Sequence, residues 1–192
     1  MENGLKFGVA SLALAIGGVA FLDLSKAASN AASPGSATVP EYMVAGHILR
    51  LLTPEGACII ELDKPGTSQR SELRLDLRPP CYLLTWRHEP ADTGLAAAEM
   101  EGTAVGQLGD PMAWRYPQAL VVAVIGDPVP ESLRSSASYK LRHDQGLHCA
   151  SSIRGVLIGE EGVWLSKKRE HVGIFCAELG LDEKEFWLLA HP

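Results

Sequence analysis

One unbroken apolar run limits how this chain can fold more than any other feature. Residues 119–126, ALVVAVIG, contain no charged or polar side chain, and Asp127 and Pro128 follow them directly. A run of this length that ends in turn residues is typical of a strand buried on both faces. We therefore expect residues 119–126 to form a central strand that is covered on both sides.

Other stretches have the two-residue period of half-buried strands. In SELRLDL, residues 71–77, leucines alternate with charged side chains, which predicts one buried and one solvated face. Residues 46–63 predict two strands joined by a turn at 53–56, because that turn contains proline and glycine. The segment CYLLTWRH, residues 81–88, predicts a further strand that would start after a pair of prolines.

A second hairpin and three weaker patterns occupy the rest of the body. Residues 152–168 predict two strands joined by a Gly-Glu-Glu-Gly turn. The segment 94–102, GLAAAEMEG, predicts a short helix, and residues 107–117 predict a loop. The polar, serine-rich sequence that follows residue 128 predicts a loop with a short helix or strand near 138–142.

The C-terminal segment CAELGLDEKEFWLL, residues 176–189, has the signals of a helix start. Asp182 and Glu185 have the spacing of a capping box, and Leu181 and Phe186 have the spacing of a hydrophobic staple. These two patterns predict a helix over about residues 182–190.

The preceding residues 171–179 fit a helix or a strand equally well. A helix there, hinged at Gly180, would create the outline of a helix-turn-helix. Its recognition helix would begin with Asp182-Glu183-Lys184-Glu185, and these acids would face the phosphates of DNA. A helix-turn-helix regulator is therefore the least favoured function.

Four cysteines form an even set in which two lie in each half of the chain: Cys58, Cys81, Cys149 and Cys176. Exported proteins oxidise such sets to disulfides, whereas cytosolic proteins keep them reduced. Three connectivities are possible, and we favour Cys58–Cys81 with Cys149–Cys176 because each pair is near in sequence. The alternative is four free, buried thiols.

The N-terminal sequence is typical of an export element. An apolar run at residues 7–22 follows Lys6, and it is short for a membrane-spanning helix. We expect residues 1–26 to be a signal peptide or a membrane anchor, residues 27–40 an Ala/Ser/Pro-rich linker, and residues 41–192 a single globular domain. The expected location is therefore periplasmic or secreted, with membrane contact only through residues 7–22 if they are not cleaved.

Charge argues against a nucleic-acid partner. The net charge is −6, and no segment of the chain is basic. Nucleic-acid binders derive most of their affinity from neutralising phosphates, so they normally have a positive surface. We expect no nucleic-acid partner, and since no phosphate loop or dinucleotide fingerprint is present, no cofactor.

No catalytic residue can be assigned from spacing alone. His88, His143 and His148 are the histidines that an exported hydrolase could use in a pocket, but the chain has no GxSxG motif. A zinc site formed by His148, Cys149, His171 and Cys176 has poor ligand spacing, so we predict no metal site.

An aromatic and basic set is the candidate binding surface: Trp114, Arg115, Tyr116, Arg87 and His88. Tryptophan, tyrosine and arginine are enriched at interface hot spots, and we expect residues 114–116 to be exposed. The chain is thus expected to be a β-rich α+β protein, an antiparallel sheet or sandwich of about seven to nine strands with a short C-terminal helix, stapled by disulfides.

The expected function follows from the compartment and the missing catalytic motifs. We favour a non-enzymatic exported protein over an enzyme, and we expect it to act by binding a protein partner in the cell envelope, as inhibitors, immunity proteins and assembly accessories do. The alternative is a small exported hydrolase that uses a histidine-containing pocket.

Overall fold

The computed structural model describes residues 39–88 and 102–191, without the side chains of residues 169–172. The N-terminal segment 1–38 and most of the helix expected at 94–102 lie outside the described residues. The expected signal peptide or anchor, and all of the expected linker except residues 39–40, therefore lie outside the described residues.

The first four strands form one antiparallel sheet in sequence order, β1-β2-β3-β4. Their bounds are β1 Glu41–Val44, β2 His47–Leu52, β3 Cys58–Asp63 and β4 Arg70–Leu75. The hairpin expected at 46–63 is formed by β2 and β3, and the alternation expected at 71–77 is confirmed by β4. Leu73, Leu75 and Leu77 pack in the core, whereas Glu72, Arg74 and Asp76 are exposed.

Strand β1 was not expected from the sequence. It pairs with β2 through a two-residue turn in which Ala45 has φ 50° and Gly46 has φ 78°. Such turns require left-handed backbone, for which asparagine or glycine is the usual signal. Because alanine at the first turn position is not such a signal, the sequence did not predict this hairpin.

The remaining strands form a second antiparallel sheet with the order β10-β9-β8-β7-β6, in which β5 also pairs with β8. Their bounds are β5 Tyr82–Leu83, β6 Thr103–Val105, β7 Ala113–Arg115, β8 Leu120–Gly126, β9 Cys149–Gly159 and β10 Gly162–Cys176. The hairpin expected at 152–168 is confirmed and is longer than expected.

The described residues contain ten strands, more than the seven to nine expected. The strands that the sequence did not predict are short: β1, β6 and β7 have three or four residues each. Residues 107–117 were expected to be a loop, but they include β7, and the strand expected at 81–88 is reduced to Tyr82–Leu83. Segments this short do not establish a two-residue period, so pairing with neighbouring strands defines them: β5 and β7 pair with β8, and β6 pairs with β7.

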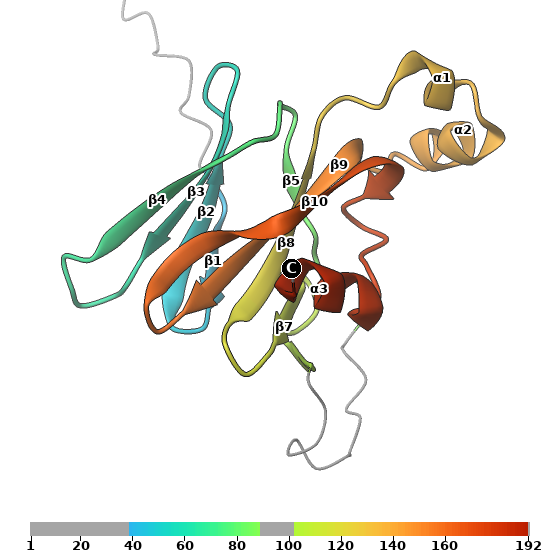
Figure 1. Ribbon diagram of the computed structural model, residues 1–192. Coiled ribbons are helices and arrows are strands. Elements are labelled where there is room, and N and C mark those ends of the chain that lie inside the picture. Colours follow the sequence, from blue (N-terminus) through green and yellow to red (C-terminus); the bar gives the residue numbers. More distant parts are fainter. Residues whose placement is uncertain (1–38, 89–101, 192) are drawn as a thin grey trace, which may run out of the picture. The chain divides into compact units, whose positions relative to one another are not determined.

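Strand β8 lies at the centre of the fold, and all seven of its residues are buried. One face of β8 packs against the first sheet through Leu120, Val122 and Val124. The other face packs with Phe186 of the C-terminal helix α3, Glu183–Ala190. Figure 1 shows the first sheet and α3 on opposite sides of the second sheet. The prediction of a strand covered on both faces is confirmed.

Helix α3 begins as its sequence predicts. Asp182 accepts a hydrogen bond from the backbone N–H of Glu185, and the Glu185 carboxylate accepts one from the backbone N–H of Asp182. Leu181 and Phe186 belong to the same apolar cluster, as the staple requires. The capping box is therefore confirmed.

The ambiguous residues before α3 are a strand and a turn. Strand β10 continues to Cys176, whose Cα pairs with that of Cys149 in β9. Pairing with β9 provides hydrogen-bond partners for the backbone groups of this segment. A helix would provide them too, but Gly173 inside it would be destabilising. A helix-turn-helix therefore lacks its first helix, and that interpretation is wrong.

A helical arm connects β8 to β9. It contains α1, Glu131–Arg134, and α2, Ala137–Asp144, neither of which has a buried residue. Helix α2 covers the region near 138–142 where a short helix or strand was expected, and the side chain of Ser136 caps it. Figure 1 shows both helices beyond the ends of β9 and β10.

Both disulfides have the predicted connectivity. Cys58–Cys81 joins β3 of the first sheet to the residue before β5 of the second, so it links the two layers. Cys149–Cys176 joins paired residues at the ends of β9 and β10. Disulfides of this kind are typical of an oxidising environment. Among the described residues, no helix combines the length and the apolar composition needed to cross a membrane.

Candidate binding cleft

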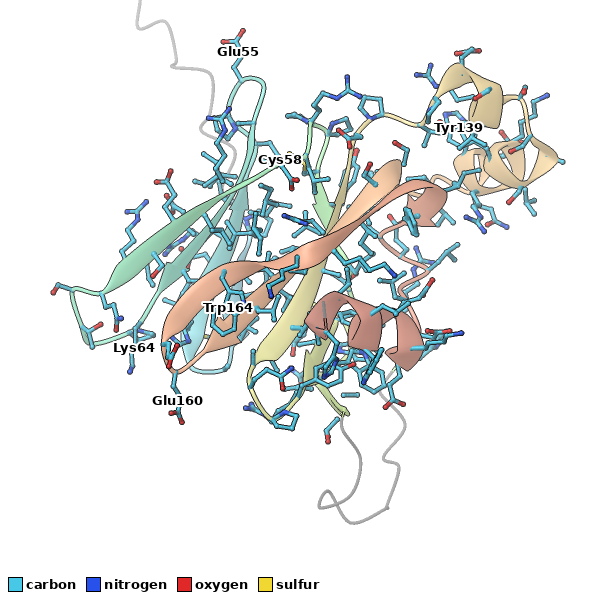
Figure 2. The ribbon with its side chains drawn as sticks, viewed as in Figure 1. Glu55, Cys58, Lys64, Tyr139, Glu160 and Trp164 are labelled. Carbon is cyan, nitrogen blue, oxygen red and sulfur yellow. A yellow bond between two sulfur atoms is a disulfide. The ribbon has the colours of Figure 1, made fainter. Side chains whose placement is uncertain are left out.

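A cleft of about 750 Å³ opens between the two sheets at one end of the sandwich. It is framed by the turns of four strand pairs: β1–β2, β3–β4, β7–β8 and β9–β10. In Figure 2, Lys64 and Glu160 lie at this end, whereas Glu55 lies at the other. The volume falls in the range of about 300–1,000 Å³ that is common for ligand sites.

The sheets are tied at the end opposite the cleft. Cys58 begins β3 and forms its disulfide there, whereas Asp63 ends β3 near the cleft. Apolar residues of both sheets form the inner part of the cleft lining, and Leu62, Leu120 and Ile158 among them are almost fully buried. The cleft is therefore the open rim of a packed core.

Four charged side chains in the cleft lining lack ion-pair partners among the described residues. Lys64 and Arg115 carry positive charge, and Glu160 and Glu161 carry negative charge. All four side chains are exposed to solvent. The cleft thus contains charges of both signs that no other described residue pairs.

The outer face of the first sheet provides a contrast. There Arg50 pairs with Glu41 at 2.8 Å and with Asp63, and Arg70 pairs with Glu61. The Glu61 side chain is nearly buried in this network. Charged residues on adjacent strands of this face neutralise one another. Ion pairing therefore explains the charges of this face, but it does not explain the charges in the cleft.

Trp164 forms an aromatic part of the cleft lining. It lies on β10 and remains 37% exposed. A Cβ atom at Gly159, in the paired strand β9, would lie only 2.7 Å from the Trp164 ring. Glycine at 159 therefore lets the indole lie against the backbone of the hairpin, and the rest of its surface is exposed to solvent.

The structure separates the side chains of the predicted binding surface. Arg115 is exposed and lines the cleft, as expected. Tyr116 also lines it but is only 3% exposed, so the expected exposure is wrong for this residue. Trp114 is half-buried and packs on the other side of β7, because successive side chains of a strand point to opposite faces. Arg87 and His88 are exposed but do not line the cleft.

Tyr116 and Trp114 are held by contacts with α3. The Tyr116 hydroxyl donates to the Glu183 carbonyl at 3.3 Å, and burial, with a smaller effect from the Glu183 charge, raises the pKa of Tyr116. The Trp114 ring packs against Trp86 at 6.3 Å and Phe186 at 6.1 Å between ring centroids. Both residues therefore serve packing, while Arg115 between them reaches the cleft.

A histidine–glutamate pair lies at the other end of β9. The Nδ1 atom of His148 is 2.5 Å from Oε1 of Glu178, and the backbone N–H of His148 donates to the same carboxylate. Burial raises the pKa of Glu178, but hydrogen bonds from His148 and from the backbone of Glu178 itself outweigh this effect, so the pKa lies below its ordinary value. Tyr82 packs on the imidazole at 4.8 Å, and burial together with the Glu178 charge raises the Tyr82 pKa.

Other groups considered for chemistry near His148 have structural partners. The hydroxyl of Ser151 bonds the carbonyls of Asp127 and Pro128. Cys149 and Cys176 form a disulfide, so neither is available as the zinc ligand considered above. His143 lies on α2 beside Asp144 at 3.9 Å and is exposed.

Sequence reasoning identified Arg115 but missed the other cleft residues. Lys64, Glu160 and Glu161 lie in hairpin turns, where exposure by itself explains a charged side chain. Only the arrangement of four turns around one opening distinguishes them. No family model, curated protein or solved structure matches this chain.

Proposed function

We propose that this chain is an exported, non-enzymatic protein that binds a protein partner in the cell envelope, as inhibitors, immunity proteins and assembly accessories do. The observation that carries the proposal is the cleft with its four unpaired charges and its half-exposed tryptophan. Aromatic and arginine side chains in such settings are common binding hot spots.

The way the cleft is built favours binding by a preformed site. Strand β3 reaches the cleft at one end, and at its other end Cys58 forms the disulfide that joins the two sheets. A site fixed before binding loses less conformational entropy when the partner arrives. The net charge of −6 would in addition increase the rate of encounter with a basic partner.

A small exported hydrolase is the second candidate, and the His148–Glu178 pair favours it. A carboxylate on Nδ1 orients the imidazole, and the His148 side chain is 58% exposed, as a general base that meets a substrate must be. The serine and cysteine beside it in sequence are engaged in a carbonyl contact and a disulfide. This candidate therefore ranks below the binding function.

Affinity capture with matched variants tests the first proposal. The oxidised protein, its Arg115→Glu variant and its Glu55→Lys variant would each be immobilised and exposed to envelope extract from the producing organism. Arg115 lines the cleft and Glu55 lies at the other end, and both side chains are exposed, so neither change should affect folding.

We expect a specific protein to be retained by the wild type and by Glu55→Lys and to be lost with Arg115→Glu. Equal retention by all three proteins, or no specific protein on any of them, would contradict a partner-binding cleft. Turnover of an ester or amide substrate that His148→Ala abolishes would instead establish the hydrolase.

A further inference from the structure

We propose that the cleft binds an extended segment of the partner protein in which an acidic side chain, an apolar side chain and a basic side chain occupy alternate positions, i, i+2 and i+4. This inference rests on the proposed function, because it specifies what part of the partner the cleft accepts. It follows from where the strand order places the charges.

The charges of the second sheet lie at opposite sides of the cleft. The strand order β10-β9-β8-β7 puts Arg115, at the end of β7, two to three strands from Glu160 and Glu161 in the β9–β10 turn. Adjacent strands are about 4.8 Å apart, so the positive and negative sides are separated by about 10–14 Å. The cleft is therefore polarised across its width.

The groups on the facing wall keep this polarity. Strand β4 packs beside β10, so Lys64, in the β3–β4 turn, lies on the side of Glu160 and Glu161. Two carboxylates against one ammonium leave that side negative. His47, on the first sheet, bonds the carbonyl of Ala45 through Nδ1 and adds no negative charge to the other side.

An extended peptide matches this spacing. Residues i and i+4 of a strand lie about 13 Å apart and on the same face, because each residue advances the chain by about 3.3 Å. An acid at one position would meet Arg115, and a base four residues away would meet Glu160 and Glu161. Either chain direction satisfies both contacts.

The middle of the cleft determines the third requirement. Between its charged sides the lining contains Leu120 and Ile158, with Leu62 on the facing wall. Residue i+2 of the segment points to the same face as i and i+4, so it would contact these apolar side chains. An apolar side chain at i+2 is therefore preferred over a polar one.

Selection from a displayed library of random heptapeptides tests this inference directly. The targets are the wild type, Arg115→Glu, the double variant Glu160→Lys with Glu161→Lys, and Glu55→Lys. Glu55 is an exposed glutamate in the β2–β3 turn at the other end of the sandwich, so its replacement is a matched control for charge reversal. Circular dichroism of each target verifies folding.

The wild type and Glu55→Lys should enrich peptides that carry an acid and a base four residues apart with an apolar residue midway. Arg115→Glu should replace the acid by a base, and the double variant should replace the base by an acid. A peptide selected on the wild type should bind each charge-reversed target about tenfold more weakly. Raising the salt concentration should reduce the difference.

Enrichment without this charge pattern, a pattern that does not change with the variants, or no enrichment at all would overturn the inference. If partner capture depends on Arg115 while the peptide selection shows no charge pattern, the inference fails and the proposed function stands. If neither experiment depends on the cleft residues, both fail.

Discussion

Glu178 shows how one carboxylate can hold two chain segments together. It follows strand β10, and it accepts hydrogen bonds from both the backbone and the ring of His148, which precedes β9. The Glu178 side chain is only 17% exposed, so these bonds have limited competition from water. Its lowered pKa means that the folded protein favours the ionised carboxylate.

Substitution of this carboxylate should make stability less sensitive to acid. Because the folded pKa of Glu178 lies below its ordinary value of 4.5, its contribution is present above that pH and is lost as the pH falls through the folded pKa. We expect Glu178→Gln to reduce the free energy of unfolding by about 1–3 kcal/mol at neutral pH. Urea unfolding from neutral to strongly acidic pH measures the difference, which should shrink as the carboxylate protonates. A constant difference would contradict this assignment.

At the scale of single elements, local sequence signals determine the conformation of α3, whereas pairing with a distant strand determines the conformation of the segment before it. Helix α3 has its own start signal, since the capping box satisfies N–H groups that would otherwise be unpaired. The segment before it has no such signal, and its conformation depends on β9. The boundary between the two therefore falls where local hydrogen bonding takes over from strand pairing.

The N-cap of α3 offers a test at this scale. Asp182→Ala removes the acceptor for the Glu185 N–H and should lower the free energy of unfolding by about 1 kcal/mol. Lys184→Ala, an exposed change in the first turn of the same helix, should have little effect. Chemical denaturation monitored by fluorescence measures both. Equal stability of Asp182→Ala and wild type would show that Phe186 packing alone fixes the helix.

At the scale of the whole molecule, the two disulfides connect different kinds of structure. Cys58–Cys81 links two separate sheets, whereas Cys149–Cys176 links strands that are already paired. Their loops are similar, with sequence separations of 23 and 27 residues. The chain-entropy model therefore assigns each about 3.5 kcal/mol of stabilisation.

Removing each disulfide should lower stability by this similar amount but loosen different regions. Replacing Cys58 and Cys81 by alanine should increase hydrogen exchange in β3 and β5 and along the cleft. Replacing Cys149 and Cys176 should increase it only at the joined ends of β9 and β10. Hydrogen-exchange mass spectrometry measures both patterns, and identical patterns would show that neither disulfide controls the distance between the sheets.

The sequence by itself determined features that depend on near neighbours. Residues 119–126 are apolar throughout and therefore must be buried on both faces, and the alternation at 71–77 requires one buried face. The capping box also depends on groups close in sequence, and four cysteines allow only three disulfide connectivities. Each of these signals is strong because few alternative partners compete for the same groups.

Only the tertiary structure decided what depends on distant segments. It determined that residues 171–176 form a strand, that Tyr116 is buried while Arg115 is exposed, and that β1 pairs with β2. It also brought Lys64, Arg115, Glu160 and Glu161 to one opening. These residues come from three turns far apart in the chain, and the free energy that places them is the packing of two sheets across a shared core, which no local pattern encodes.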